Sequence, residues 1–393
     1  SLALLIFGIG IISLMLQLNS LIKTQMDNNL KGIDMVVGAK GSPLQLILSA
    51  VYHIDSPTGN ISVKDAKKIK NNRMVGSSID LLYGDNYKGY RIVGTDEKFL
   101  DLYNAKIKDG RKWDKPLEVV VGSKIHTKLN INLDDELTSS HGLRETGEKH
   151  ANQLFKVVGL LKPSNSVIDQ LIITSPQSIW DLHDDHDHDE EHDHDEEHDH
   201  DEEHDHDEEH DHDDKEITAM LIKFKSPMNI IQFPRQINED TNLQAAVPSY
   251  EISRLFKLFG FGIETLTYLA YLIIIVSGFS LFINLFNSMR ERKYEMALIR
   301  TLGSSRRQLS LMIFESLILT TIGFFIGLLV SRLGVMFVSS LMEESLNYNL
   351  NSFGILKEEL WLLGLSIFIG LISSIIPALQ VYNLNISETL ADE

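Results

Sequence analysis

The sequence of 393 residues contains no cysteine. Disulfide bonds and thiolate metal sites are therefore excluded, although this absence does not identify the compartment. A phosphate-binding loop of the form G-x-x-x-x-G-K-S/T is also missing, so any phosphate-cradling chemistry must come from another chain. No grouping of serine or carboxylate side chains indicates a hydrolase. We therefore assign no catalytic residue and expect that the chain is not an enzyme.

Charge is absent from long stretches of the chain. Residues 2–18, 266–285 and 360–379 carry no charged side chain, and residues 309–331 are interrupted only by Glu315. A stretch of about 20 apolar residues spans the ~30 Å hydrocarbon core as a helix, and in lipid only a helix or a closed barrel satisfies its own backbone. We predict four transmembrane helices rather than the buried core helices of a soluble protein.

The first apolar stretch differs from a secretory signal peptide. No basic residue precedes it, and no small-residue cleavage site follows Leu18, whereas a signal peptide has both features. We expect a retained first helix whose cytoplasmic beginning precedes Ser1.

Basic residues in the short connections predict the orientation. Residues 287–308 hold six Lys and Arg against two acidic residues, whereas residues 341–359 hold one Lys and four Glu. An excess of Lys and Arg marks cytoplasmic loops, so the first connection faces the cytoplasm and the second faces outward. The segment from about 20 to 263 then lies outside a bacterial inner membrane, and the tail 386–393 lies inside.

The net charge of −19 comes almost entirely from residues 183–214, which are 11 His and 21 Asp or Glu. The hexad His-Asp-His-Asp-Glu-Glu occurs four times between His186 and Glu209. Such a self-repelling segment cannot bury apolar surface and is predicted to be disordered. The remaining chain is close to neutral, so we expect no nucleic-acid partner.

The repeat is the candidate metal-binding segment, because imidazole and carboxylate groups suit Zn²⁺, Ni²⁺ and Cu²⁺. We expect several exchangeable sites rather than one cage of fixed geometry, and no tightly bound cofactor. The alternative is a repeat expansion without a specific role. The isolated His53, His126, His141 and His150 are expected to be ordinary surface residues. The candidate ligands are His183, His186, His188, His192, His194, His198, His200, His204, His206, His210 and His212.

The long outer segment is predicted to fold as an α/β domain with room for two lobes. Short apolar runs bounded by turn residues predict strands at 34–37, 90–93, 117–121, 155–161, 170–174 and 220–224. Helices are predicted at 63–71, 97–103 and 176–182.

At the ends of the segment, apolar residues recur at helical spacing from Leu18 to Leu30 and from Ile252 to Phe259. We interpret both ends as helical stalks, the alternative being helices that lie on the lipid surface.

The connection between the second and third spans carries a family resemblance. The order of Arg292, Glu295, Arg300 and Gly303 resembles the coupling segment of MacB/FtsX/LolC-type ABC transporter permeases, although Met296 and Ala297 stand where that family more often has Ile-Gly. The resemblance continues through Glu315, Gly323 and Gly327, and through 377–379 and 385–390, where Ile386 or Ser387 replaces a proline. Short segments around Gly38, Gly110, Gly122 and Gly159 are similar to the family's periplasmic core domain.

The resemblance implies a permease subunit that relies on a separate cytoplasmic ABC ATPase, so that ATP is used only through this partner. It also implies a second permease copy or a paralogue, and a dimer. Residues 290–303 fit a coupling role physically, because they are predicted to form an amphipathic helix whose apolar side could enter a groove on the ATPase and which Gly303 would end. The alternative is that these basic residues only set the orientation. The predicted coupling residues are Arg292, Glu295, Met296, Ile299, Arg300 and Gly303.

Two charged residues in the spans need an explanation. Glu315 lies inside the third span, and an intramembrane carboxylate is a candidate functional site; we expect packing rather than ion transport. Arg332 marks the outer interface, where its side chain could snorkel towards water.

The resulting fold class is an α-helical membrane protein with four transmembrane helices and a large extracytoplasmic α/β domain between the first and second, on helical stalks. We divide the chain into 1–31 (first span and stalk), 32–248 (outer domain with the repeat), 249–289 (stalk and second span), 290–308 (coupling helix), 309–342 (third span), 343–357 (outer loop), 358–385 (fourth span) and 386–393 (tail).

We expect ATP-driven motion to be transmitted to the outer domain, in an export, uptake or envelope process linked to zinc or another metal. A periplasmic metal-binding or substrate protein is an expected partner. The alternative is a metal-ion carrier or a metal-sensing receptor without an ATPase. A carrier needs ligands within the membrane, and the predicted spans contain no His or Asp and only Glu315 as a carboxylate.

Overall fold

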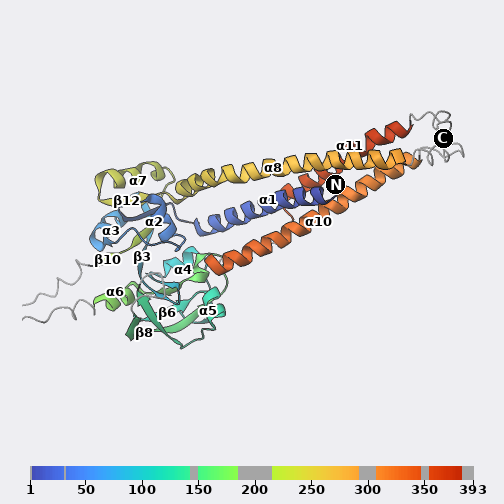
Figure 1. Cartoon of the computed structure of the whole chain (residues 1–393). Coiled ribbons are helices and arrows are strands. Elements are labelled where there is room, and N and C mark those ends of the chain that lie inside the picture. The colour runs from blue at the N-terminus through green and yellow to red at the C-terminus, as the bar shows by residue number, and fades with distance from the viewer. Residues whose placement is uncertain are drawn as a thin grey trace, which may run out of the picture. The chain divides into compact units, whose positions relative to one another are not determined.

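The computed structural model describes residues 2–30, 32–141, 149–184, 215–291, 307–346 and 354–382. The chain forms two compact units: a helical unit of residues 1–24 and 257–393, and an outer domain of residues 25–256 (Figure 1).

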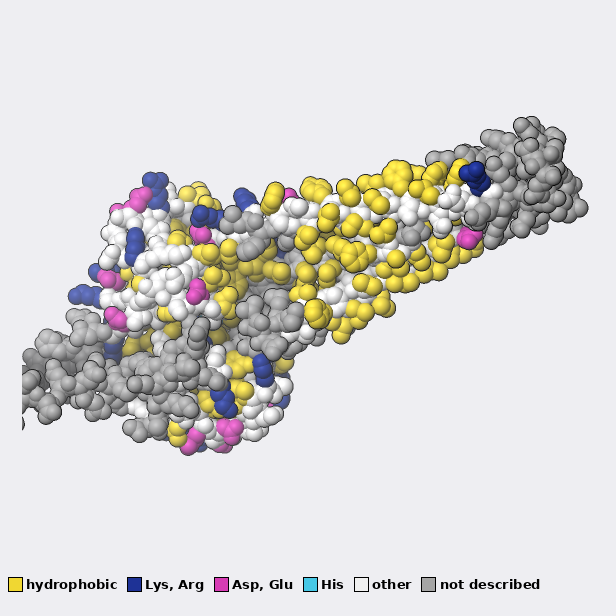
Figure 2. Space-filling model, in the orientation of Figure 1, with side chains coloured by type: hydrophobic (Ala, Val, Ile, Leu, Met, Phe, Trp, Pro, Cys, Tyr) yellow, Lys and Arg dark blue, Asp and Glu magenta, His cyan; other side chains and the backbone are white. Residues whose placement is uncertain are grey.

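The helical unit is built from long apolar helices. They are α1 (Leu2–Leu30), α8 (Pro248–Glu291), α10 (Arg307–Leu346) and α11 (Lys357–Tyr382). Among the described residues, four helices are long and apolar enough to cross a membrane, as the sequence predicts. Figure 2 shows hydrophobic side chains over much of the visible surface of these helices, as expected for a surface in contact with lipid.

Small residues allow the helices to pack closely. On α10, a Cβ at Gly327 would lie 3.0 Å from the Ile6 carbonyl oxygen of α1, and one at Gly323 would lie 3.1 Å from Leu5. The Ser316 hydroxyl donates to the Gly370 carbonyl of α11 over 3.1 Å. Without water to drive association, transmembrane helices depend on such close contacts and interhelical hydrogen bonds. The helices of this unit are therefore packed for mutual contact rather than loosely grouped.

The strands of the outer domain are β1 (Met35–Ala39), β2 (Ile61–Ser62), β3 (Val75–Tyr87), β4 (Tyr90–Thr95), β5 (Ile107–Gly110), β6 (Glu118–Val121), β7 (Glu136–His141), β8 (Lys149–Leu161), β9 (Ile172–Thr174), β10 (Glu216–Ile217), β11 (Ala219–Phe224) and β12 (Leu243–Ala246). The main sheet has the order β12-β1-β11-β3-β4-β9-β6-β8-β5, and β7 pairs with both β3 and β8. The pairings therefore close a ring, β3-β4-β9-β6-β8-β7 and back to β3. The long strand β3 belongs both to this ring and to the open sheet, so the domain has the two parts that the sequence allows.

Alternate side chains of the strands enter two apolar clusters. Met35 and Val37 of β1 belong to one cluster and Val36 to the other, as the period of two in a strand requires. The first cluster also takes residues from α3 (Val63–Lys70), α5 (Ser123–Leu129), α6 (Pro176–Asp184) and α7 (Asn229–Asp240). The second takes residues from α2 (Pro43–Ala50) and α4 (Lys98–Leu102). Both faces of the sheet are thus covered.

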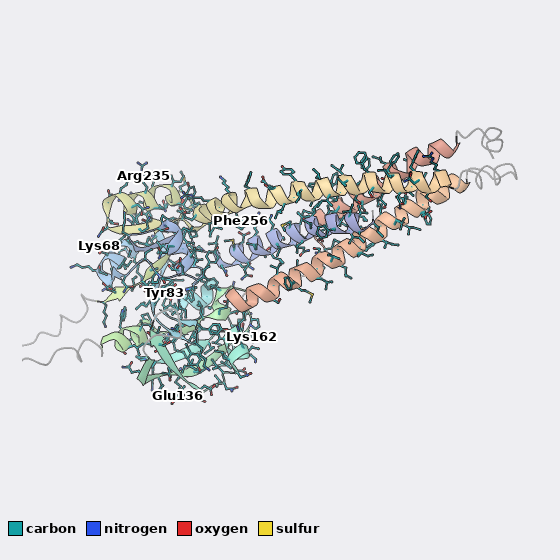
Figure 3. All side chains as sticks on the ribbon, in the orientation of Figure 1. Lys68, Tyr83, Glu136, Lys162, Arg235 and Phe256 are labelled. Atoms are coloured by element: carbon teal, nitrogen blue, oxygen red, sulfur yellow. The ribbon has the colours of Figure 1, made fainter. Side chains whose placement is uncertain are left out.

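All predicted strands and helices of the outer domain occur in the structure. The predicted stalk residues Met26, Leu30, Leu255 and Phe256 pack against the second apolar cluster, within the outer domain itself (Phe256 is labelled in Figure 3). These ends of α1 and α8 are therefore part of the domain's core packing, while a role as stalks that lift the domain stays a prediction.

Candidate functional site

A buried ion pair lies among the membrane helices. The guanidinium of Arg332, on α10, donates to both carboxylate oxygens of Glu359, on α11, over 2.9 and 2.7 Å. The Glu359 side chain is fully buried and that of Arg332 is 13% exposed. A paired bidentate geometry of this kind is the strongest that an arginine and a carboxylate form.

The first helix completes this site. The Ser13 hydroxyl of α1 donates to Glu359 Oε1 over 2.6 Å and lies 2.9 Å from the Ser331 hydroxyl of α10. The Gln17 amide, one turn further along α1, donates to the Gly354 carbonyl over 3.0 Å. Arg332 donates to the same carbonyl over 2.9 Å. The cluster therefore ties α1, α10 and the beginning of α11 together; we call Ser13, Gln17, Arg332 and Glu359 the intramembrane clamp.

The position of Glu359 in the sequence explains why it is tolerated there. Glu359 lies in the first turn of α11 and accepts the Leu356 backbone N–H over 2.9 Å. Carboxylates are favourable in the first turn of a helix, where backbone N–H groups are unpaired. A buried charge is otherwise costly unless a partner and further hydrogen bonds satisfy it. Each of these conditions is met at Glu359.

The clamp corrects one prediction. Arg332 does not extend into water, because its guanidinium is turned to Glu359. Glu359 lies within the predicted fourth span, 358–385, and in the first turn of α11. A sequence signal was present: Arg332 directly follows the apolar stretch 309–331 and Glu359 directly precedes the stretch 360–379, so the predicted orientation puts both near the outer membrane face.

Glu315 lies on α10, inside a candidate span, with an exposed side chain. It forms no ion pair with any residue that the structure describes. The carboxylate is exposed on the surface of the helical unit, and a packing role for it stays a prediction.

The outer domain has a buried polar cluster of its own. His53, which was expected at the surface, is 8% exposed, and its Nδ1 atom lies 2.7 Å from the Tyr83 hydroxyl (Tyr83 is labelled in Figure 3). The Arg91 guanidinium lies 4.5 Å from the centre of the Tyr83 ring and donates to the Asp55 carbonyl over 2.7 Å. Burial lowers the pKa of His53 well below its usual value, and the charge of Arg91 acts in the same direction. The cluster fixes the loop that contains His53 and Asp55.

The other predicted site residues lie outside the described part of the chain. This holds for the coupling residues Arg292, Glu295, Met296, Ile299, Arg300 and Gly303 and for ten of the eleven histidines of the repeat, while the backbone of His183 is in the last turn of α6. Among the described residues, no group of three or more His, Cys, Asp or Glu side chains could hold a metal ion. The metal prediction therefore depends on the repeat alone.

These features define the class of protein: a multi-pass membrane protein with four apolar helices and a large α/β domain between the first and second. Two family models match the chain, the MacB-like periplasmic core domain over residues 1–239 and the FtsX-like permease C-terminal domain over residues 268–386. The chain belongs to the MacB/FtsX-type ABC transporter permease family. Members are permease components whose ATPase is a partner in the cytoplasm, and the chain is accordingly an inner-membrane protein with an extracytoplasmic domain.

Solved structures of outer domains are distantly similar. The periplasmic region of MacB from Actinobacillus actinomycetemcomitans has 11% identity and a TM-score of 0.34, with 58% of this chain and 95% of that chain covered. The extracellular domain of the noncanonic ABC-type transporter YknZ from Gram-positive bacteria has 11% identity and a TM-score of 0.32, with 54% and 98% covered. No curated protein matches the sequence. The family assignment rests on the two family models.

Proposed function

We propose that this permease subunit transmits ATP-driven motion from a separate cytoplasmic ATPase to its extracytoplasmic domain. The intramembrane clamp is the observation that carries the proposal. It fixes α10 and α11 to α1 through charge-assisted hydrogen bonds, and α1 is one continuous helix whose last residues belong to the outer domain. A displacement of α10 would therefore be passed to α1 rather than absorbed between them.

The predicted coupling segment supports the direction of transmission. The segment 290–303 begins in the last turn of α8, which ends at Glu291, and precedes α10, which begins at Arg307. An ATPase that binds this segment would act on both helices. Because α8 begins at Pro248, within the outer domain, it offers a second continuous connection to that domain.

Two sets of variants test the proposal in the complete complex. Charge reversal in Glu295→Arg or Arg300→Glu should release the ATPase or abolish stimulated ATP hydrolysis while membrane insertion is unchanged. Glu359→Gln should keep the ATPase bound but lower stimulated hydrolysis, since Glu359 is not part of the predicted coupling segment. The matched control is Glu358→Gln, which removes an exposed carboxylate next to Glu359. Unchanged co-purification and hydrolysis in all the test variants would contradict the proposal.

We also propose a second permease copy beside α10. A charged side chain that faces lipid is costly, and the exposed Glu315, near the beginning of the candidate span Ile313–Ser340, gives α10 such a side chain. Contact with a second copy would remove it from lipid. Because the chain has no cysteine, Phe314→Cys, next to Glu315 and 60% exposed, can be oxidised without background. Cross-linked dimers are expected, and monomers alone would contradict this arrangement.

The metal link is proposed for the repeat 183–214. Its imidazoles must be neutral to bind Zn²⁺, so binding should weaken as the pH falls towards 5. Calorimetry on the full-length protein with and without residues 183–214 tests this, and equal zinc stoichiometry in the two would place the sites elsewhere. The alternative of a metal carrier is less well supported, because Glu359, the buried carboxylate of the described spans, is already paired with Arg332.

A further inference from the structure

The helix α3 presents a strongly basic surface on the outer domain. Residues 63–73 contain five basic side chains and a single acidic one, Asp65. All five basic side chains are exposed, while Ala66 and Ile69 hold the opposite side of the helix in the apolar core. We call this surface the basic face; its residues are Lys64, Lys67, Lys68, Lys70 and Arg73.

Much of this positive charge is not neutralised within the domain. Lys68 pairs with Asp65 over 2.8 Å, and Lys70 is 3.6 Å from Asp80. Lys64, Lys67 and Arg73 form no ion pair with any described residue. Clustered like charges repel one another, so the basic face has an electrostatic reason to bind an anionic partner.

The acidic repeat is attached to the domain next to this surface. Strand β10, which follows the repeat, pairs with β2, which immediately precedes α3: Glu216 is opposite Ser62, and Ile217 is opposite Ile61. The Val63 N–H, at the first residue of α3, donates to the Lys215 carbonyl over 2.9 Å. Lys215, which directly follows the repeat, therefore accepts a hydrogen bond from the first residue of the basic helix α3.

The helix that leads into the repeat contacts the same place. The Trp180 indole N–H, on α6, donates to the Glu216 carbonyl over 2.9 Å, and the Lys215 ammonium lies 5.1 Å from the centre of the Trp180 ring. Helix α6 ends at Asp184, the second residue of the repeat. The described segments on either side of residues 185–214 thus meet beside β2 and α3, and each residue of an extended chain adds up to roughly 3.3–3.6 Å of reach.

We propose that the basic face is a docking surface for the acidic repeat of the same chain, and that metal binding by the repeat weakens this docking. The repeat carries 21 acidic side chains, and attachment beside the surface gives it an effective concentration in the millimolar range, typical of short flexible linkers. Zn²⁺ on the imidazoles brings positive charge to the repeat and competes with the lysines for its carboxylates. The docking itself is independent of the ATPase; only its release rests on the metal binding proposed above.

Carbodiimide cross-linking of the full-length protein tests the docking, because it joins lysine amines to carboxylates in direct contact. Cross-links from the repeat to α3 are expected at low ionic strength and should decrease several-fold at 1 M salt, where the Debye length is about 3 Å. Proximity alone would not depend on salt. Lys64→Gln with Lys67→Gln should reduce the cross-links of the remaining Lys68 and Lys70. The control, Lys106→Gln with Lys162→Gln, removes two exposed lysines elsewhere on the domain and should not; Lys68 and Lys162 lie well apart in Figure 3.

Experiments with added zinc test the docking of the repeat and its release by metal separately. If calorimetry shows zinc binding, the cross-links to α3 should fall as zinc is added, and unchanged cross-links would overturn the release step. If no zinc binds, the metal role of the repeat fails, while salt-sensitive cross-links would still support the docking.

Other occupants of the basic face would overturn the docking. Cross-links that form only between isotopically light and heavy copies would assign the surface to a second molecule. Vesicles with anionic lipids that bind through Lys64 and Lys67, with no cross-link from the repeat, would assign it to a membrane.

Discussion

The two units each contain a bidentate arginine–glutamate pair, in opposite surroundings. In the helical unit, Arg332 and Glu359 are 13% and 0% exposed. In the outer domain, Arg111 and Glu118 are 49% and 12% exposed, and their nitrogen and oxygen atoms approach to 2.5 and 2.7 Å. Figure 2 shows the same contrast on a larger scale, with charged side chains gathered on the outer domain and hydrophobic ones on the helices.

The surroundings decide what each pair does. Glu118 closes a local turn, since it also accepts the Asp114 N–H over 2.8 Å, four residues away. Glu359 joins residues that are 346 positions apart in the chain. Water can replace a lost partner beside Arg111 but not within the helical unit. The arginine–glutamate pair therefore stabilises a local turn in the outer domain, whereas in the helical unit it connects separate helices.

The largest effect is expected from breaking the buried pair. Glu359→Gln leaves the Arg332 charge without its partner, and removing one member of a buried pair costs about 3–5 kcal/mol. Thermal unfolding of the protein in detergent measures it, with Glu358→Gln as the exposed control. A double variant, Arg332→Leu with Glu359→Leu, should be less destabilised than Glu359→Gln because no buried charge remains. Equal effects of Glu359→Gln and Glu358→Gln would show that the clamp does not hold the helices.

A smaller effect is expected at the exposed pair. Glu118→Gln should cost about 1–2 kcal/mol, since hydrogen bonds to a charged group are lost at a site that water reaches. The bonds from Arg111 are the main reason that the pKa of Glu118 falls from 4.5 to about 2. A lowered folded-state pKa means that the stabilisation is present above pH 4.5 and is lost as the pH falls towards 2. Hydrogen exchange in β5 and β6 should show this acid loss in the wild type and not in the variant.

The smallest effect is expected from His53 and depends on pH. Its pKa is lowered in the folded protein, so below about pH 6.5 the unfolded chain binds a proton that the folded one does not, and stability falls. Asn tolerates the positive backbone φ of 56° at this position. His53→Asn should therefore lose less stability than the wild type between pH 7.5 and 5.5 in denaturant titrations. An equal loss in both proteins would assign the pH dependence to other groups.

Sequence patterns predicted the membrane helices and much of the outer domain because both depend on local signals. The six predicted strands are apolar runs that lie in the sheet as β1, β4, β6, β8, β9 and β11. The predicted helix 63–71 matches α3, whose Ser62 caps the Asp65 N–H. Such features are decided within a few residues and can be seen in the sequence.

The missed features depend on partners distant in the chain. Strand β3 contains Gly76, Ser77, Ser78 and Asp85, which do not predict a strand, yet it pairs with β11 on one side and β4 on the other. Gly159, in one of the segments that are similar to the family's periplasmic core domain, is also required by a distant neighbour. A Cβ at this position would lie 2.2 Å from the Arg111 carbonyl oxygen. The clamp is missed for the same reason, since neither Ser13 nor Glu359 indicates the other. Tertiary pairing, rather than local preference, decides these positions.

The pairing of the segments that flank the acidic repeat has a consequence for its length. Trp180 and β10 bring these described segments together, and each doubling of a flexible loop costs only about 0.6 kcal/mol in closure entropy. Each additional hexad would bring two imidazoles and four carboxylates with almost no penalty to the domain that holds them. A change in the number of hexads is therefore expected to alter the net charge of the chain while the closure cost to the domain changes little.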